Sequence, residues 1–279
     1  MLGRCTFPAP GSTVVCGLSG GADSTALVAL AVAAGCEVTA IHVNHGLRTS
    51  ATLDADIARA TAAQLQIEFR SVDVDVADGP NLEARARAAR RAALGPDALT
   101  GHTADDQAET LLLALLRGSG AAGLGAIGPG WRHPILALRR FETAAVCTHF
   151  GLRVAHDPTN DDPRFRRNRI RHDLLPLLDD IAKRDVTVLL NRTADHLRAD
   201  EQFLDELAAA IDPTDADQLA TAPRVLAARA VRHWIELDGY PPDTDTVQRV
   251  LAVAKGHSAA CELAGGRRVE RQNGRLRLV

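Results

Sequence analysis

The sequence predicts an α/β fold with a doubly wound parallel sheet, followed by a smaller helical domain. In the first half of the chain, strand-like runs alternate with helix-like segments, which is the pattern of βαβ units. Polar motifs follow several of the strand-like runs, and ligands bind at the carboxyl ends of strands in parallel sheets. From Arg139 onward the strand signals fade and helical periodicity takes over, which indicates a change of architecture.

The expected strands are short runs rich in β-branched and apolar residues. They cover residues 13–17, 37–43, 67–72 and 98–101. The expected helices carry apolar residues at helical spacing, and they cover residues 24–34, 50–65, 82–94 and 104–116. Helical patterns also cover residues 164–211 and 223–254, and a Gly265-Gly266 turn predicts a hairpin near the C-terminus.

These patterns divide the chain into three expected parts. Residues 1–180 form the α/β domain, residues 181–256 a helical domain, and residues 257–279 a short strand-like remnant. The first boundary is placed in a charge run at residues 179–185, which separates two apolar faces.

The composition limits the classes of protein to which the chain can belong. It has 279 residues, 46% of them hydrophobic, which is enough for a substantial core. No apolar run is long enough to span a membrane, and the N-terminus lacks the apolar stretch of a signal peptide. The five cysteines are scattered without a C-x-x-C pair, which favours a reducing, cytoplasmic location. Because the net charge is −3, any surface for nucleic acid must be local.

The segment LSGGADST at residues 18–25 is the most informative motif in the chain. It lies between an expected strand and an expected helix, so its glycine backbone and the helix N-terminus can hold a phosphate. The expected phosphate-binding residues are Ser19, Gly20, Gly21, Ala22, Asp23, Ser24 and Thr25. The loop has no lysine and is therefore not a Walker A motif. The carboxylate of Asp23 and a phosphate would repel each other, so the presence of Asp23 in this loop favours a metal ion that binds both groups.

Two further segments place histidine or arginine near expected strand ends. In HVNHGLR at residues 42–48, His45 and Arg48 are candidates for nucleotide contact, whereas no third ligand follows at a useful spacing for a metal. In NLEARARAARR at residues 81–91, Arg87 either pairs with Glu83 along a helix or faces a polyanion with its neighbours. The glycine-rich segment 118–130 follows a helix, which favours a lid or substrate loop over a dinucleotide site.

The segment GHTADDQAETLLL at residues 101–113 gathers acids at the start of an expected helix. Asp106 and Glu109 are three residues apart and share a helix face, and His102 lies at the helix entry. Helix capping accounts for one of the acids in the first turn. The complete set suits the binding of a metal or an ammonium group, or proton transfer.

Five arginines occur within residues 164–171, and no acid interrupts them. The run includes Arg166, Arg169 and Arg171. Because guanidinium groups bind phosphate well, contact with a polyanion is the expected use, and an exposed arginine-rich face is the alternative.

In this order, the motifs resemble those of the tRNA(Ile)-lysidine synthetase family, within the PP-loop ATP pyrophosphatases. The loop SGGADS is shared with many PP-loop enzymes, whereas HVNHGLR, GHTADDQAETLLL and DPTNDDPRFRRNRIRHDLLP together are specific to this family. The matching segments lie within residues 13–178, and the chain looks like a short form with a reduced C-terminal region.

The resemblance implies a catalytic PP-loop domain at residues 1–180 and a helical tRNA-binding domain at residues 181–256. The implied enzyme is a cytoplasmic ligase that forms a C–N bond. ATP would adenylate C2 of the wobble cytidine in a CAU-anticodon tRNA(Ile), and free L-lysine would then displace AMP to give lysidine. ATP and Mg²⁺ are the implied cofactors, no membrane is involved, and a homodimer is compatible with the resemblance.

The motifs and the resemblance together give each candidate residue an expected role. The loop residues 19–25, His45 and Arg48 are expected to bind ATP, and Asp23 is expected to hold Mg²⁺. The expected catalytic residues are Asp23, His102, Asp106 and Glu109, of which Asp106 and Glu109 are also expected to bind the lysine ammonium. The expected tRNA-binding residues are Arg87, Arg166, Arg169 and Arg171.

Two other functions fit parts of the sequence. A PP-loop tRNA sulfurtransferase would share the adenylation step, but such enzymes usually use paired cysteines, and none is spaced for that here. A non-catalytic nucleotide- or RNA-binding module is the second alternative. The presence of Asp23, His102, Asp106 and Glu109 argues against it.

Overall fold

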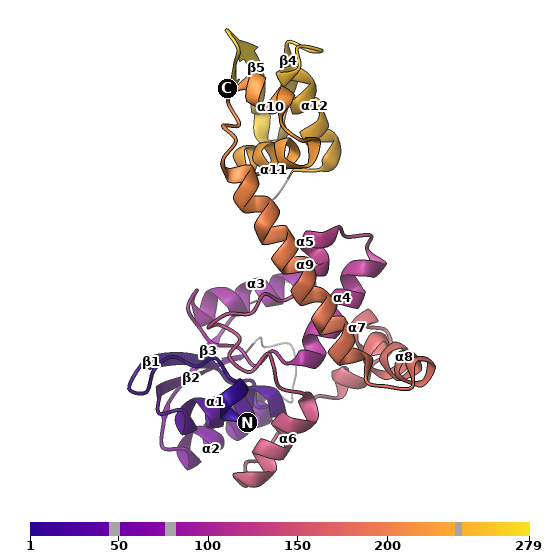
Figure 1. The fold of residues 1–279 in the computed structure, drawn as a ribbon. Helices are drawn as coiled ribbons and strands as arrows, with labels where there is room; N and C mark the ends of the chain where they lie inside the picture. The colour runs from indigo at the N-terminus through magenta and orange to yellow at the C-terminus, as the bar shows by residue number, and fades with distance from the viewer. Residues whose placement is uncertain (45–50, 76–81, 238–241) are drawn as a thin grey trace. The chain divides into compact units, whose positions relative to one another are not determined.

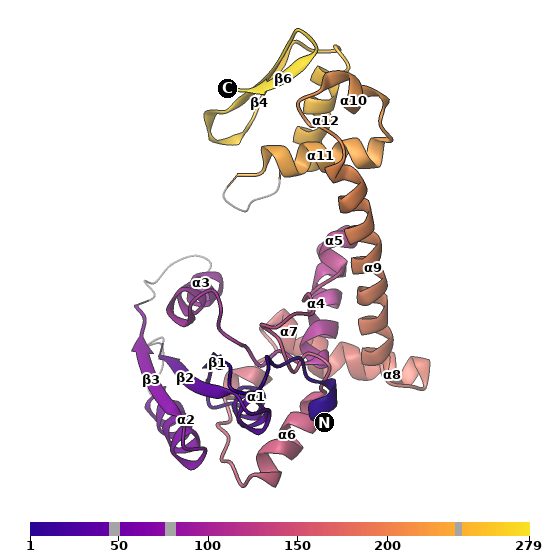
Figure 2. The same cartoon turned by 60° about the vertical axis from the view of Figure 1, so that its left-hand side comes forward.

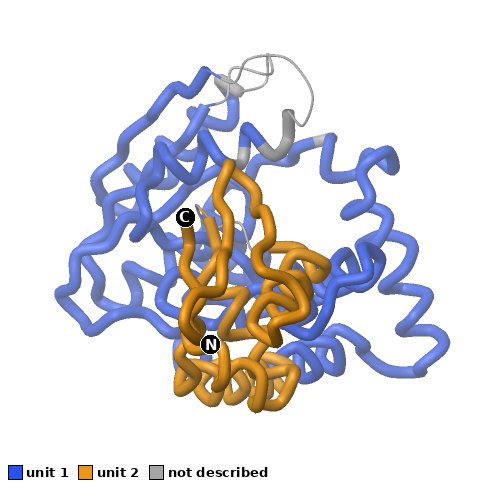
Figure 3. The backbone as a smooth tube through the Cα atoms, turned by 90° about the horizontal axis from the view of Figure 1, so that it is seen from above, with its two compact units in different colours: residues 1–195 blue, residues 196–279 orange. Residues whose placement is uncertain are grey.

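The computed structural model describes residues 1–44, 51–75, 82–237 and 242–279. The chain divides into two compact units, residues 1–195 and residues 196–279, which Figure 3 colours separately. The division falls inside the helix α9 (Val186–Ala209). Each unit has a hydrophobic core of its own, so the two are described in turn.

Unit 1 is built on a parallel three-stranded sheet with the order β1-β2-β3 (Figures 1 and 2). The strands are β1 (Thr13–Gly17), β2 (Glu37–Asn44) and β3 (Glu68–Asp73). In β1, Val14 and Cys16 are buried and alternate with more exposed residues, which is the period of a strand. The predicted α/β class with a parallel sheet is therefore confirmed.

The fourth expected strand, at residues 98–101, is present only as a single bridge between Leu99 and Cys16. The N–H of Leu99 donates to the carbonyl of Val15 (2.8 Å), and its own carbonyl accepts from the N–H of Gly17 (3.0 Å). The pairing stops there because β1 itself ends at Gly17, where the chain turns into the next loop. The prediction of a full strand at this place was wrong.

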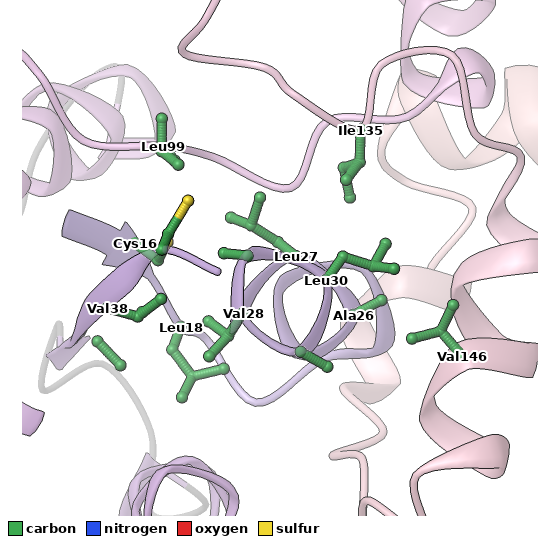
Figure 4. Close-up of a cluster of buried hydrophobic side chains, with 14 of the residues drawn as sticks. Cys16, Leu18, Ala26, Leu27, Val28, Leu30, Val38, Leu99, Ile135 and Val146 are labelled. Atoms are coloured by element: carbon green, nitrogen blue, oxygen red, sulfur yellow. The ribbon is translucent and has the colours of Figure 1, made fainter. Parts of the chain in front are cut away.

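Helices lie on both faces of the sheet. Unit 1 contains α1 (Ala22–Ala33), α2 (Ala51–Gln64), α3 (Leu82–Leu94), α4 (Ala104–Leu116), α5 (Ala121–Leu124) and α6 (Arg140–His149). Figure 2 shows α1 and α2 on one face and α3 on the other, as a doubly wound sheet requires. The small apolar side chains of α1 are buried almost all round, because the helix lies between the sheet and α6. Figure 4 shows Leu27 and Leu30 of α1 within this core.

The last part of unit 1 is a helical run with a local irregularity. It contains α7 (Arg166–Arg169), a π-helical turn (Ile170–Leu174), α8 (Leu175–Ala182) and the first part of α9. Pro176 lies at the start of α8 and has no N–H to donate back along the helix, which accounts for the widened turn before it. Ile170 and Leu175 pack with Leu111 of α4 in a second core, which fixes this run against α4.

Unit 2 combines short helices with a small antiparallel sheet. It contains α10 (Ala216–Thr221), α11 (Arg224–Ile235), α12 (Thr244–Ala254), β4 (Ala260–Glu262), β5 (Arg268–Gln272) and β6 (Arg275–Leu278). Gly265 and Gly266 have positive φ and join β4 to β5, as predicted. The third strand was missed, although Asn273-Gly274, both at positive φ, is a typical tight hairpin turn. In the described part of the chain, no helix has the length and apolar character needed to cross a membrane.

Candidate functional site

The loop between β1 and α1 is a tight turn that internal hydrogen bonds hold in place. Gly20 has φ +90°, and a Cβ there would lie 3.2 Å from the carbonyl oxygen of Asp54. The hydroxyl of Ser24 accepts from the N–H of Ser19 (3.1 Å) and donates to the carbonyl of Gly21 (3.0 Å). Among the described residues no side chain caps α1, so the N–H groups of its first turn are available to an anion.

A cavity of about 230 Å³ adjoins this loop. Its polar lining comes from separate segments of unit 1 and includes Ser19, Asp23, Ser24, Arg90, Thr100, His102, Asp106 and Arg167. The structure thus brings the predicted phosphate loop and part of the predicted acid cluster to one place. Their meeting at the carboxyl end of β1 is what the position of both motifs in a parallel sheet requires.

Asp23 lies in the first turn of α1 and is the carboxylate of the loop that reaches the cavity. Its Oδ1 accepts a hydrogen bond from the hydroxyl of Thr143, and its Oδ2 lies 3.5 Å from Nε of Arg140. Burial raises the pKa of Asp23 above its ordinary value, although the Thr143 hydrogen bond and Arg140 act in the opposite direction. The negative charge is therefore incompletely compensated, which suits a carboxylate that receives a cation.

Asp106 serves two purposes at the start of α4. Its Oδ2 accepts hydrogen bonds from the N–H and the hydroxyl of Thr103, both at 2.8 Å, and so completes a capping box. Its Oδ1 lies 3.2 Å from Arg140 and 3.0 Å from Arg167. Burial alone would raise the pKa of Asp106, but the two guanidinium groups and the Thr103 N–H outweigh it and hold the pKa below its ordinary value. Asp106 is therefore an ionised carboxylate on the cavity wall.

Glu109 lies one turn further along α4 and is completely buried, with 0% of its surface exposed. Its carboxylate oxygens lie 3.1 Å from Arg140, 2.6 Å from Arg167 and 2.7 Å from Arg171. It is not part of the cavity lining, because the three guanidinium groups surround it. The role expected for Glu109 in binding a lysine ammonium stays a prediction, and the structure shows it as the centre of an arginine cluster.

Arg140 is a central residue that the sequence patterns did not indicate. It contacts Asp23, Asp106 and Glu109, and so it joins the loop to both acids of α4. Its neighbour Arg139 pairs with Asp105 (3.1 Å). No local signal singled out Arg140, because its partners lie on α1 and α4, far away in the sequence.

The predicted tRNA-binding arginines differ in their exposure and in their ion-pair partners. Arg171 pairs with buried Glu109, whereas Arg166 is exposed and Arg169 forms an exposed pair with Asp173 (3.3 Å). The side chain of Arg87 lies outside the described part of the structure, as do His45 and Arg48. The nucleotide contacts predicted for the last two and the tRNA contacts of the arginines stay predictions.

His102 belongs to a small polar group at the edge of the cavity. Its Nδ1 lies 2.9 Å from the hydroxyl of Thr100 and 3.2 Å from Nδ1 of His133, and the two rings meet edge to face. Burial lowers the pKa of His102 to about 4, and His133 acts in the same direction, against the nearby Asp106. His102 is therefore neutral at neutral pH and a weaker base than an ordinary histidine.

This low pKa predicts that His102 makes the protein less stable in mild acid. Its pKa is about 4 in the folded protein against 6.5 ordinarily, so between these values the unfolded chain binds the additional proton. The free energy of unfolding should fall as the pH is lowered through this window, by at most about 1.4 kcal/mol per pH unit from this group. For His102→Gln, the free energy of unfolding in urea should depend less steeply on pH in this window than for the wild type. His257→Gln, at an exposed position, is the control, and equal slopes for the wild type and His102→Gln would contradict the prediction.

Gly101 is required by close backbone contact rather than by an unusual φ. A Cβ at residue 101 would lie 2.7 Å from the carbonyl oxygen of Asp23 and 3.0 Å from the nitrogen of Ser24, neither of which can move without displacing the loop. Gly101→Ala is expected to destabilise the protein by about 1–3 kcal/mol, as measured by urea unfolding. Gly128→Ala is the matched control because no atom lies within 4 Å of a Cβ there. If Gly101→Ala is as stable as Gly128→Ala, the backbone at Asp23 and Ser24 can move to accept a Cβ at residue 101, and the prediction is wrong.

Comparisons with known proteins match both parts of the chain. The family described as "PP-loop domain" matches residues 3–178, and the family described as "TilS substrate binding domain" matches residues 215–277. A tRNA(Ile)-lysidine synthase from Nocardia farcinica is 42% identical over 261 residues, which cover 88% of this chain and 82% of that protein. The same enzyme from Mycobacterium leprae is 40% identical over 247 residues, covering 82% of this chain and 76% of that protein.

A solved structure resembles this chain in its fold. It is the U34-tRNA thiolase NcsA from Methanococcus maripaludis with its [4Fe-4S] cluster, with a TM-score of 0.53 and 20% identity. The match covers 68% of this chain and 72% of that protein. At this level of identity the likeness concerns the fold alone.

Proposed function

Since the chain belongs to the tRNA(Ile)-lysidine synthase family, we propose that it joins L-lysine to the wobble cytidine of a CAU-anticodon isoleucine tRNA. Its PP-loop domain implies the use of ATP, and its TilS substrate-binding domain implies the binding of tRNA. The observation that carries the proposal is the cavity where the loop of residues 19–25 meets His102 and Asp106. An ATP-binding loop beside a proton acceptor and a carboxylate fits an enzyme that first activates a base and then attacks it with an amine.

In the proposed first step, the loop and the N-terminus of α1 hold the phosphates of ATP. The C2 oxygen of the cytidine attacks the α-phosphorus, pyrophosphate leaves, and the adenylated base remains. Mg²⁺ uses few protein ligands and takes several oxygens from phosphates and water. Asp23, a carboxylate on the cavity wall within the loop, fits this requirement as a protein ligand. When bound, Mg²⁺ would neutralise part of the charge on the phosphates.

In the proposed second step, the amine of lysine attacks C2 and AMP leaves. An amine of this kind is protonated at neutral pH, with a pKa of about 10.4, so it must lose a proton before it attacks. Asp106 provides an ionised carboxylate on the cavity wall to attract the ammonium group. His102 lies on the same cavity and is neutral, so it is the proposed proton acceptor; its low pKa makes it a weaker base than an ordinary histidine. Glu109 would act through the arginines that it positions.

The remaining parts of the chain are proposed to hold the tRNA. The expected helical tRNA-binding domain at residues 181–256 overlaps the matched substrate-binding family, which also includes the antiparallel sheet of unit 2. Exposed arginines such as Arg166 and Arg169 supply charge in unit 1 for the RNA backbone. A homodimer is a further expectation, which light scattering on the purified protein measures directly.

The sulfur-inserting alternative finds no support in the cysteines. Cys16, Cys36 and Cys147 are buried, and Cys5 and Cys261 lie in different units. No cysteine belongs to the described lining of the cavity. Persulfide or cluster chemistry would need such a thiol near the activated base.

A direct assay tests the proposed function. The protein is incubated with a CAU-anticodon isoleucine tRNA transcript, ATP, Mg²⁺ and labelled lysine. The expected result is lysine-dependent release of AMP together with label at the wobble base. A transcript with a different anticodon is the control. Absence of lysine incorporation, or incorporation from a sulfur donor, would overturn the proposal.

A further inference from the structure

A second cavity, of about 580 Å³, lies directly beside the one that holds the loop and the acids. The two cavities share the lining residues Arg90, Leu94, Thr100 and His102. The second one is bounded by the C-terminal half of α3 and by the segment around Arg132 and His133. The two cavities therefore adjoin, so a polymeric substrate whose target group enters the first has its neighbouring group close to the second.

The walls of the second cavity combine positive charge with apolar surface. Its basic residues are Arg90, Arg91 and Arg132, its histidines are His102 and His133, and its described lining contains no acid. Between them lie small apolar residues such as Ala88, Ala92 and Pro96. Arginines beside small apolar patches suit a nucleotide, because guanidinium groups bind its phosphate and the apolar surface accepts its sugar and base.

An exposed tryptophan is the neighbour in the chain of a residue that lines this cavity. Trp131 directly precedes the lining residue Arg132 and exposes 47% of its surface, although aromatic residues make up only 3% of the chain. The guanidinium of Arg132 lies 5.5 Å from the centre of the Trp131 ring. An exposed aromatic ring with an arginine beside it is the usual platform on which a base of single-stranded RNA stacks.

We propose that the second cavity and Trp131 bind the nucleotide that flanks the target cytidine in the anticodon loop. The base of this nucleotide stacks on Trp131, and its phosphate contacts Arg132 and Arg91. Enzymes that modify a single base commonly select the site through contacts with the flanking nucleotides. This inference rests on the proposed function, because it takes the target base to lie in the first cavity.

The test measures binding of an anticodon stem-loop RNA to the full-length protein and to variants of it. Trp131→Ala is expected to weaken binding about tenfold, within the range known for removal of one stacked base. Trp131→Phe should retain most of the affinity, because a smaller ring still stacks. Phe141→Ala is the matched control, since Phe141 is also exposed (69%) with an arginine, Arg139, 5.8 Å from its ring. Unlike Trp131, it has no neighbour in the chain among the described residues that line either cavity.

A second set of RNAs identifies the stacked base. Each loop nucleotide in turn is replaced by an abasic one, and the affinities for wild type and Trp131→Ala are compared as a double-mutant cycle. One flanking position should weaken binding to the wild type but not to Trp131→Ala. Equal losses for both proteins at every position, or a Trp131→Ala affinity within twofold of the wild type, would overturn the inference. Failure of the wild type to form lysidine counts against the proposed function instead, and the binding cycle still reports separately on Trp131.

Discussion

Replacing Asp23 with asparagine is expected to slow formation of AMP by about 10³-fold, the scale seen when one charged or polar group is removed from a catalytic site. The amide has nearly the same shape as the carboxylate and can still accept the hydrogen bond of Thr143. It lacks the negative charge that the proposed Mg²⁺ needs, so ATP would bind without its phosphates being correctly neutralised. The assay is release of AMP in the presence of lysine and the tRNA transcript.

The same substitution is expected to leave the protein as stable as the wild type or more stable. Because burial raises the pKa of Asp23, its charged form opposes folding at pH values above the ordinary carboxyl pKa. Asparagine removes this cost at neutral pH, so the free energy of unfolding in urea should not fall. Asp180→Asn, at an exposed position in unit 1, is the control for both measurements. Full activity of Asp23→Asn at low Mg²⁺ would falsify the metal assignment.

Replacing Glu109 with alanine is expected to destabilise the protein by about 3–5 kcal/mol, the usual effect of removing one partner from a buried ion cluster. The substitution leaves Arg140, Arg167 and Arg171 with their guanidinium groups close together and without the central carboxylate. Urea unfolding at neutral pH measures the effect. The free energy of unfolding of Glu109→Gln should lie between those of the wild type and Glu109→Ala, because the amide still accepts a hydrogen bond but carries no charge.

A surface ion pair provides the matched control for Glu109. Asp173→Ala breaks the exposed pair with Arg169 and should change the free energy of unfolding by less than about 0.5 kcal/mol. If Glu109 instead binds lysine directly, Glu109→Ala would keep the wild-type stability and raise the KM for lysine. The free energy of unfolding and the KM for lysine of Glu109→Ala therefore decide whether Glu109 holds the arginine cluster together or binds lysine.

The predictions that were confirmed depend on local patterns. The expected helices at residues 82–94 and 104–116 coincide with α3 and α4, because both carry sustained helical periodicity. The loop at residues 18–25 lies between a strand and a helix as predicted, because a strand, a glycine turn and a helix follow one another directly in the chain. In both cases the information lies within a few residues of the feature that it specifies.

The features that were missed depend on tertiary contacts. The position of Glu109 on the same helix face as Asp106 was predicted correctly, but its burial is set by three arginines from two other segments of the chain. Arg140 carries no motif of its own, and its importance follows only from where α6 packs against α1. The bridge at Leu99 is likewise limited by where β1 ends.

The arginine cluster around Glu109 also bears on how the protein is made. The partners of Glu109 lie 31, 58 and 62 residues further along the chain, so each contact closes a loop of that length. As the chain leaves the ribosome, the sheet and α4 emerge before all three of these arginines. A nascent chain that ends before Arg167 contains only one of the guanidinium groups that neutralise Glu109. The arginine cluster, whose member Arg167 also lines the cavity, is therefore complete only once residue 171 has been synthesised, 62 residues after Glu109.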